Sequence, residues 1–157
     1  MPEALQATMP SDQEIQVTRT FNAPRQLVWD AHTKPELVQR WLLGPDGWTM
    51  PICEIDFRVG GKYRYGWANP SDGRAFEMGG VFKEVAPVER IVHSERFGEA
   101  ESQVTMLLAE ARGKTTMTLT IRYDSKQTRD AAFATGMTTG MERSYQRLDD
   151  MAAESHA

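Results

Sequence analysis

Two residues with catalytic potential lie close together in this chain. His93 and Glu95 are two positions apart in a strand-like run, so they share one face of that strand. A carboxylate beside an imidazole shifts the pKa of both groups and can transfer a proton or orient a polar ligand group. The pair faces inward if the odd-numbered positions of the run do. The alternative places Val92 and Ser94 inside and leaves His93 and Glu95 in solvent.

Other chemistry is not indicated. No histidine stands at metal-ligand spacing from another histidine or from Cys53, so we expect no metal site. The chain contains no nucleophile elbow, phosphate-binding loop or dinucleotide fingerprint, so we expect no cofactor. Cys53 is the only cysteine and cannot form an internal disulfide, which favours a reducing, cytoplasmic location.

Aromatic and methionine side chains give a second candidate site. Tyr63, Tyr65 and Trp67 alternate with polar or small residues, so three rings should face inward from one strand. Buried tyrosine and tryptophan need polar partners, and a few polar groups in an apolar wall are typical of a small-molecule site. Packing of an ordinary core is the alternative. The predicted ligand-binding residues are Trp41, near the entrance, and Tyr63, Tyr65, Trp67, Phe76, Met78, His93, Met106, Met137 and Met141.

The elements that must position these residues follow from periodicity. Residues 14–21 alternate polar with apolar or β-branched types and predict a first strand. Asn22 should cap a short helix with Pro24 in its first turn, and a second helix should begin at Pro35.

From Thr49 the period changes to two, and the runs are separated by short, turn-rich connections typical of hairpins. The predicted strands are 49–57, 61–68, 75–85, 90–97, 102–110 and 115–123. A helix over 127–151 follows, with an apolar stripe of Phe133, Met137, Met141, Ser144, Leu148 and Met151. One long helix after consecutive antiparallel strands predicts an α+β helix-grip fold, in which a curved sheet wraps around the C-terminal helix. Such a sheet would leave a cavity between itself and the helix.

Composition narrows the class of protein. The 157 residues fit one domain, which we place at 13–152, and residues 1–12 and 153–157 should be disordered. The net charge of −4 argues against nucleic acid and anionic membranes as partners. There is no apolar run long enough for a membrane span and no N-terminal secretory signal.

Six short motifs carry a resemblance to a known family. They are Phe21 to Trp29, Arg40-Trp41 with Gly44-Pro45, Cys53 to Asp56, Gly60 to Tyr63, Pro87 to Val92, and Gly140 to Leu148. In this order they resemble the START-related SRPBCC superfamily, in the branch named after the C-terminal domain of the activator of the heat-shock-protein-ninety ATPase. The resemblance spans about residues 13–152 and implies the same helix-grip architecture.

The resemblance leaves the function open, because relatives include carriers of hydrophobic ligands, cyclases, sensors and co-chaperone domains. The eukaryotic co-chaperone has a further N-terminal domain, whereas about twelve residues precede the first predicted strand here, so we do not expect chaperone activation. We expect binding of a small apolar or aromatic molecule. An enzyme of the cyclase, isomerase or hydrolase type using His93 and Glu95, a protein-interaction domain, and a homodimer stay open as alternatives.

Overall fold

The computed structural model describes the backbone of residues 4–156 and the side chains of residues 4–154. Within the described backbone, eight strands form one sheet, and four helices accompany it. The elements are, in order, β1 (Gln6–Ser11), β2 (Glu14–Phe21), α1 (Arg25–Thr33), α2 (Pro35–Trp41), β3 (Thr49–Ile55), β4 (Lys62–Ala68), β5 (Ala75–Ala86), β6 (Arg90–Phe97), β7 (Ala100–Ala111), β8 (Lys114–Arg122), α3 (Lys126–Ala134) and α4 (Met137–His156).

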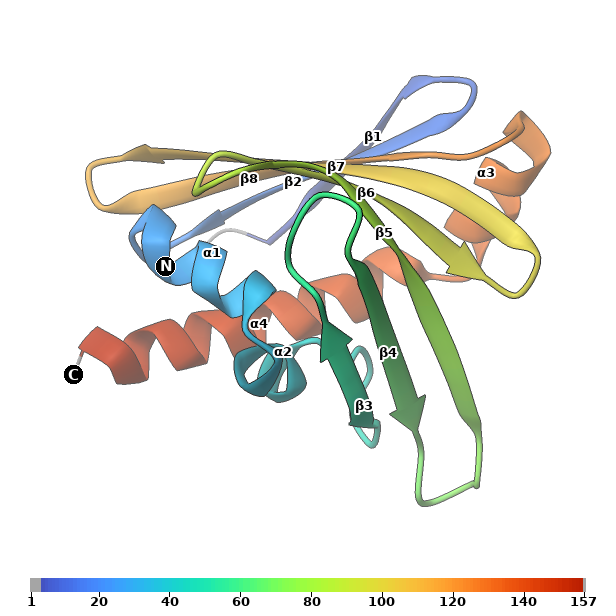
Figure 1. Ribbon diagram of the computed structural model, residues 1–157, viewed down its shortest axis with the longest axis horizontal. Helices are drawn as coiled ribbons and strands as arrows, with labels where there is room; N and C mark the ends of the chain where they lie inside the picture. Colours follow the sequence, from blue (N-terminus) through green and yellow to red (C-terminus); the bar gives the residue numbers. More distant parts are fainter. Residues whose placement is uncertain (1–3, 157) are drawn as a thin grey trace.

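The sheet is antiparallel throughout, in the order β1-β2-β8-β7-β6-β5-β4-β3. Strands β3 to β8 form a meander, and β2 pairs with β8 over its whole length, from Glu14 opposite Arg122 to Phe21 opposite Thr115. The sheet bends so that β3, β4 and β5 turn toward the side on which α4 lies (Figure 1). The predicted α+β fold, a curved antiparallel sheet around a C-terminal helix, is confirmed.

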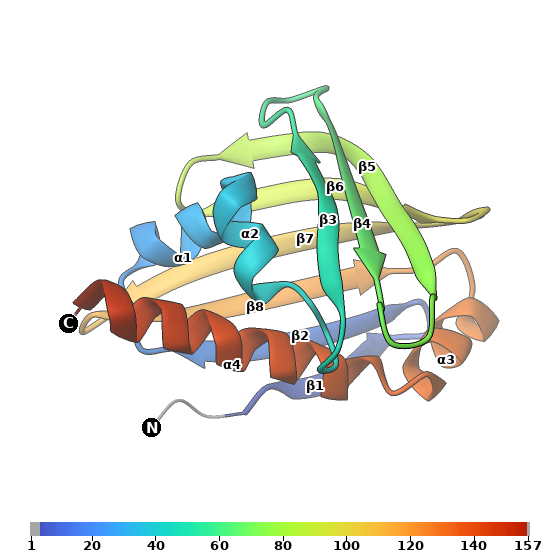
Figure 2. The ribbon, with the colours of Figure 1, turned by 90° about the horizontal axis from the view of Figure 1, so that it is seen from below.

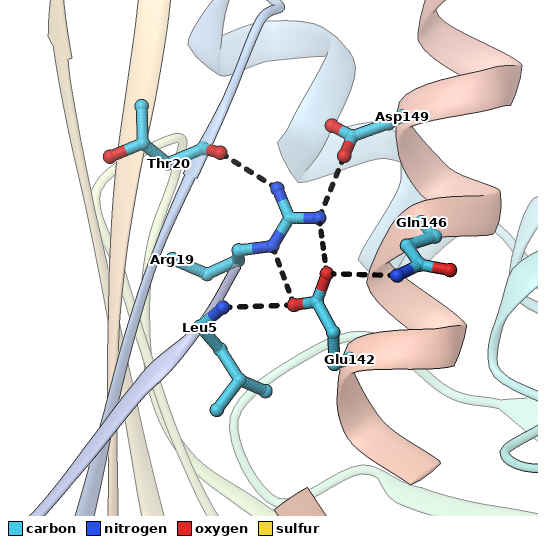
Figure 3. A network of polar contacts seen from close by, with 6 residues as sticks. All are labelled: Leu5, Arg19, Thr20, Glu142, Gln146 and Asp149. Atoms are coloured by element: carbon cyan, nitrogen blue, oxygen red, sulfur yellow. Dashed lines mark hydrogen bonds and ion pairs between the residues drawn. The ribbon is translucent and has the colours of Figure 1, made fainter. Parts of the chain in front are cut away.

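Helix α4 lies across the concave face of the sheet, with α1 and α2 beside it (Figure 2). Its Leu148 is fully buried, and its Tyr145 ring meets Phe21 of β2 edge to face at 5.5 Å. Polar contacts add to this packing: Arg19 of β2 lies between Glu142 and Asp149 of α4 (Figure 3). The core therefore lies between the sheet and the helices α1, α2 and α4, and it includes Phe21, Trp41 and Leu148.

The two short helices depart from the prediction at one cap. Pro24, not Asn22, is the residue before the first turn of α1, and no side chain caps that turn. Pro24 has an extended backbone (φ −68°, ψ 155°), a conformation that proline favours and that suits a position outside the helix. Helix α2 does begin at Pro35. The N–H groups in the first turn of a helix have no partner within the helix, so proline, which lacks this N–H, is well suited to that position.

The single helix predicted over 127–151 is wrong, because the chain forms two helices, α3 and α4. Gly136 separates them in the left-handed region, with φ of 78°, which glycine adopts without steric cost. The break also removes Phe133 from the apolar stripe: it is 39% exposed on α3, whereas Ser144, Leu148 and Met151 are buried. At the other end, α4 continues to His156, so residues 153–156 are helical rather than disordered. Residue 157 lies outside the described residues.

The N-terminal segment is not the disordered tail that composition predicted. Residues 6–11 form β1, which pairs with β2, while residues 1–3 of the predicted tail lie outside the described residues. Most of β1 is exposed, and a polar strand at a sheet edge needs backbone pairing more than apolar content. Two further hydrogen bonds hold it: the Leu5 N–H donates to Glu142, and Arg129 donates to the carbonyl of Ser11.

Candidate functional site

The register of β6 places His93 on the inner face of the sheet. His93 pairs with Val104 of β7 and with Phe82 of β5, and directly paired residues share a face. Val104 and Phe82 are buried. Glu95, two residues further, lies on the same face, so the inward reading holds. Val92 and Ser94 are also buried, but on the outer face, where the Ser94 hydroxyl accepts from the N–H of Val81.

His93 is tied into the sheet by its Nδ1 atom. This atom lies 2.9 Å from the carbonyl oxygen of Ser94 and 3.0 Å from the hydroxyl of Tyr63, which itself donates to Ser94 at 2.7 Å. Because the carbonyl can only accept, Nδ1 carries the hydrogen in this arrangement. Burial lowers the pKa of His93, so the ring is neutral at pH 7.

Glu95 lacks any comparable partner. It forms no hydrogen bond or ion pair with another residue of the described chain, and burial alone raises the pKa of its carboxyl to about 7. In addition to their own burial, the nearby Glu95 charge raises the pKa of Tyr63, Tyr65, Tyr123 and Tyr145. These tyrosines come from β4, the residue after β8, and α4. The charge of one unpaired carboxyl on β6 therefore acts on residues from β4, α4 and the end of β8.

A row of aromatic rings leads from this region to the surface. Tyr63 and Tyr65 lie 5.0 Å apart between ring centroids, and Trp67 follows 5.8 Å from Tyr65. Phe76 of β5 stacks on Trp67 at 5.0 Å and contacts Phe97 of β6 at 5.5 Å. Tyr63 is buried, whereas Phe97 is 52% exposed. The row therefore connects solvent with the concave face.

Most of the predicted ligand residues are brought to this face. Tyr65 and Met78 are paired across β4 and β5 and are both half-buried. Met137 and Met141 of α4 are also half-buried, and the hydroxyl of Tyr123 donates to the sulfur of Met137 at 3.8 Å. Met106 belongs instead to the packed core, with 4% exposure.

Trp41 does not lie at an entrance. It is 2% exposed, stacks on Tyr145 of α4 and contacts His32 of α1. Its indole N–H already donates to the carbonyl of Ala31 at 2.7 Å. Trp41, the last residue of α2, lies in the core because its ring points toward α1 and α4. The periodicity of α2 alone could not reveal this orientation.

Two surface hollows lie beside α4 and along β4, β5 and β6, and the second is partly lined by Tyr63 and Met78 of the predicted site. One of about 640 Å³ is lined mainly by residues that alternate with the aromatic row, including Lys62, Arg64 and Arg96. The other, of about 410 Å³, lies beside α4 and is lined by Leu5 and Glu142 among others. The case for a site on the concave face therefore rests on the half-buried apolar residues and the unpaired carboxyl that line it.

The sequence prediction missed two contributors. Tyr123 continues the alternation of Met117, Leu119 and Ile121 on the buried face predicted for the last strand, but it was not among the predicted ligand residues. Phe97 shares the parity of His93 and Glu95 and could have been found in the same way. Across residues 4–154, no three His, Cys, Asp or Glu side chains gather as metal ligands would. No helix of the described chain has the length and apolar character needed to cross a membrane.

A curved antiparallel sheet that grips a C-terminal helix, with half-buried aromatic residues between them, defines a helix-grip domain of the START-related type. Within that class, the chain belongs to the family described as Activator of Hsp90 ATPase homolog 1-like protein, which residues 22–153 match.

Solved structures agree with this assignment. A protein from Rhodobacter sphaeroides is 33% identical, with 96% of this chain and 98% of that chain covered and a TM-score of 0.89. A protein from Nitrosomonas europaea, 21% identical over 94% and 99% of the two chains, shares the fold with a TM-score of 0.84. So does an AHSA1-like protein from Aeromonas hydrophila, 19% identical over 83% and 92%, with a TM-score of 0.65. No protein of curated function matches the chain.

Proposed function

We propose that this protein binds a small apolar or aromatic molecule between the concave face of the sheet and helix α4. The observation that carries the proposal is the aromatic row from Tyr63 to Phe97, whose rings are in contact and whose outer end is exposed. Flat rings along one wall suit stacking of a ligand ring.

The opposite wall is adaptable. Met137 and Met141 are half-buried on α4, while Met78, half-buried on β5 and paired with Tyr65, adds a thioether to the sheet wall. Thioether side chains adjust to ligand shape and make favourable contacts with ring edges. An apolar site with a few polar groups is the usual form of a small-molecule site, and Tyr65, His93 and Glu95 would supply those groups here.

An enzymatic function receives less support. A general base is normally oriented by a hydrogen bond, and no hydrogen bond joins His93 to Glu95 in the described structure. His93 is instead engaged by Tyr63 and Ser94. No observation on the outer surface favours a particular protein partner.

Titration with the neutral fluorescent dye N-phenyl-1-naphthylamine tests the proposal. The wild type should bind the dye with enhanced fluorescence. Tyr65→Ala should weaken binding by roughly two- to tenfold, the value of one aromatic contact of about 0.5–1.5 kcal/mol. Met141→Trp should weaken it by filling the space.

The matched control is Arg64→Ala, because Arg64 is the next residue of the same strand and is exposed on the outer face. It should bind the dye like the wild type. Absence of dye binding to the wild type, or equal binding by all four proteins, would overturn the proposal. Trp67→Ala is a poorer probe, since Trp67 packs with Val38 and Met50 and its indole donates to the carbonyl of Leu42.

A further inference from the structure

Glu95 differs from the other carboxylates of the described residues because it is largely buried and yet has no hydrogen-bond or ion-pair partner. Most other acidic residues in contact with arginine or lysine lie at the surface, for example Glu77 with Arg64 and Glu101 with Arg96. Glu95 lies on the inner face of β6, opposite Ser102 of β7, and the step from the Gly79–Arg96 pair brings Gly80 opposite it on β5. Neither neighbour, a glycine on β5 and a serine on β7, offers the carboxyl a positive charge.

The ionisable groups of the described residues whose pKa the Glu95 charge raises carry no positive charge: they are Tyr63 and Tyr65 on β4, Tyr123 after β8 and Tyr145 on α4. His93, two residues away on the same face of β6, has a neutral ring because burial lowers its pKa. The Cys53 thiol on β3, opposite Tyr65, stays protonated because burial raises its pKa to about 11. The buried cation of the inner face, Arg19, is already held by Glu142 and Asp149.

We propose that Glu95 is the polar anchor of the concave-face site, and that the natural ligand is an apolar or aromatic molecule carrying a protonated amine. The inference rests on the proposed function, since it concerns the same site. A carboxylate without a cation is expensive to bury, and a cationic ligand removes that cost. Aromatic faces attract the same cation, so the tyrosines around Glu95 add to the selectivity.

Titration calorimetry with three naphthalene probes of similar shape tests the inference. They are 1-naphthylmethylamine, which is cationic, 1-naphthalenemethanol, which is neutral, and 1-naphthoate, which is anionic. At pH 8 the wild type should bind the amine about tenfold more tightly than the alcohol, as one charge-assisted hydrogen bond would give, and the naphthoate most weakly.

Glu95→Gln should abolish the preference and bring the amine and the alcohol within about twofold of each other, because the amide keeps the shape of the side chain without its charge. The matched control is Glu99→Gln, an exposed carboxylate in the adjacent β6–β7 turn, which should keep the full preference. The wild-type preference should also increase from pH 6 to pH 8, since the amine stays protonated while Glu95, with a pKa of about 7, ionises.

The outcomes separate the two proposals. If the wild type binds the alcohol but shows no preference for the amine, or if Glu95→Gln keeps that preference, the anchor role is wrong and the apolar site stands. If no naphthalene probe binds, the proposed function fails and the anchor fails with it.

Discussion

The guanidinium of Arg19 on β2 and the carboxylate of Glu142 on α4 form a two-point ion pair, with Nε–Oε1 and Nη2–Oε2 distances of 2.9 and 3.0 Å (Figure 3). A third hydrogen bond from Arg19 reaches Asp149 at 2.8 Å, about two helical turns further along α4. Arg19 is 2% exposed at its side chain, so the contact between the sheet and the gripping helix includes a buried charge network.

Removing Arg19 should therefore destabilise the fold strongly. Arg19→Met should lower the free energy of unfolding by about 3–5 kcal/mol, because Glu142 and Asp149 would be left as neighbouring, partly buried carboxylates. Arg40→Met is the control, since Arg40 also pairs with an α4 carboxylate, Glu154, but in solvent; about 0–1 kcal/mol is expected there. Urea unfolding compares the two, and equal losses would contradict a buried network.

Leu148 should carry a large share of the packing between α4 and the sheet. It is fully buried, so Leu148→Ala should reduce the free energy of unfolding by about 2–5 kcal/mol. Phe133→Ala should cost about 0.5 kcal/mol or less, because Phe133 is 39% exposed on α3. A loss below that level for Leu148→Ala would mean that α4 does not pack as described.

Glu95 should make stability depend on pH in an unusual direction. Its pKa rises from an ordinary value near 4.5 to about 7 on folding, so the folded state holds the extra proton between these values. The contribution of Glu95 to the free energy of unfolding is therefore most favourable below about pH 4.5, and it is lost as the pH rises to about 7. Thermal melts should show Glu95→Gln more stable than the wild type at pH 8, by up to about 3 kcal/mol, with little difference at pH 4.5.

That comparison needs a control for general effects of losing a negative charge. Glu99→Gln removes the same charge from an exposed position and should change the melting temperature little at either pH. A Glu95→Gln protein no more stable than the wild type at pH 8 would contradict the buried, unpaired state of this carboxyl.

Deleting residues 1–11 should destabilise the protein, contrary to the expectation from composition. The deletion removes the β1–β2 ladder, the Leu5 hydrogen bond to Glu142 and the Arg129 bond to Ser11, for a net loss of roughly 1–3 kcal/mol. Met9→Ser, an exposed change within β1, should have no measurable effect on the melting temperature. An unchanged melting temperature after the deletion would show that β1 adds nothing to stability.

Two glycines should respond oppositely to alanine. A Cβ at Gly80 would collide with the carbonyl oxygen of Ser94 on the neighbouring strand, so Gly80→Ala should be destabilising by more than about 2 kcal/mol. A Cβ at Gly140 would meet only the ring of Pro45 at 3.3 Å, and alanine favours the helix by about 1 kcal/mol, so Gly140→Ala should be neutral or stabilising. Chemical denaturation of both variants decides the matter.

The local pattern of the sequence was sufficient for the order of β2 to β8, α1 and α2, and for much of the inner face of the sheet. Alternation in Tyr63, Tyr65 and Trp67 and in Met117, Leu119 and Ile121 depends only on the two-residue period of a strand, which any antiparallel sheet keeps. Seven strand positions, β2 to β8, and the two short helices that begin at or just after a proline were predicted from that period and from turn residues.

Tertiary contacts decided the features that the sequence periodicity left open. The inward orientation of His93 and Glu95 depends on the register with Phe82 and Val104, because both faces of β6 carry buried residues. Likewise β1 exists through pairing with β2 and contacts with α4, which its polar composition does not encode. The unpaired state of Glu95 is set by residues from β4, β6, α4 and the end of β8 that are far apart in the chain, and only folding brings them around one carboxyl.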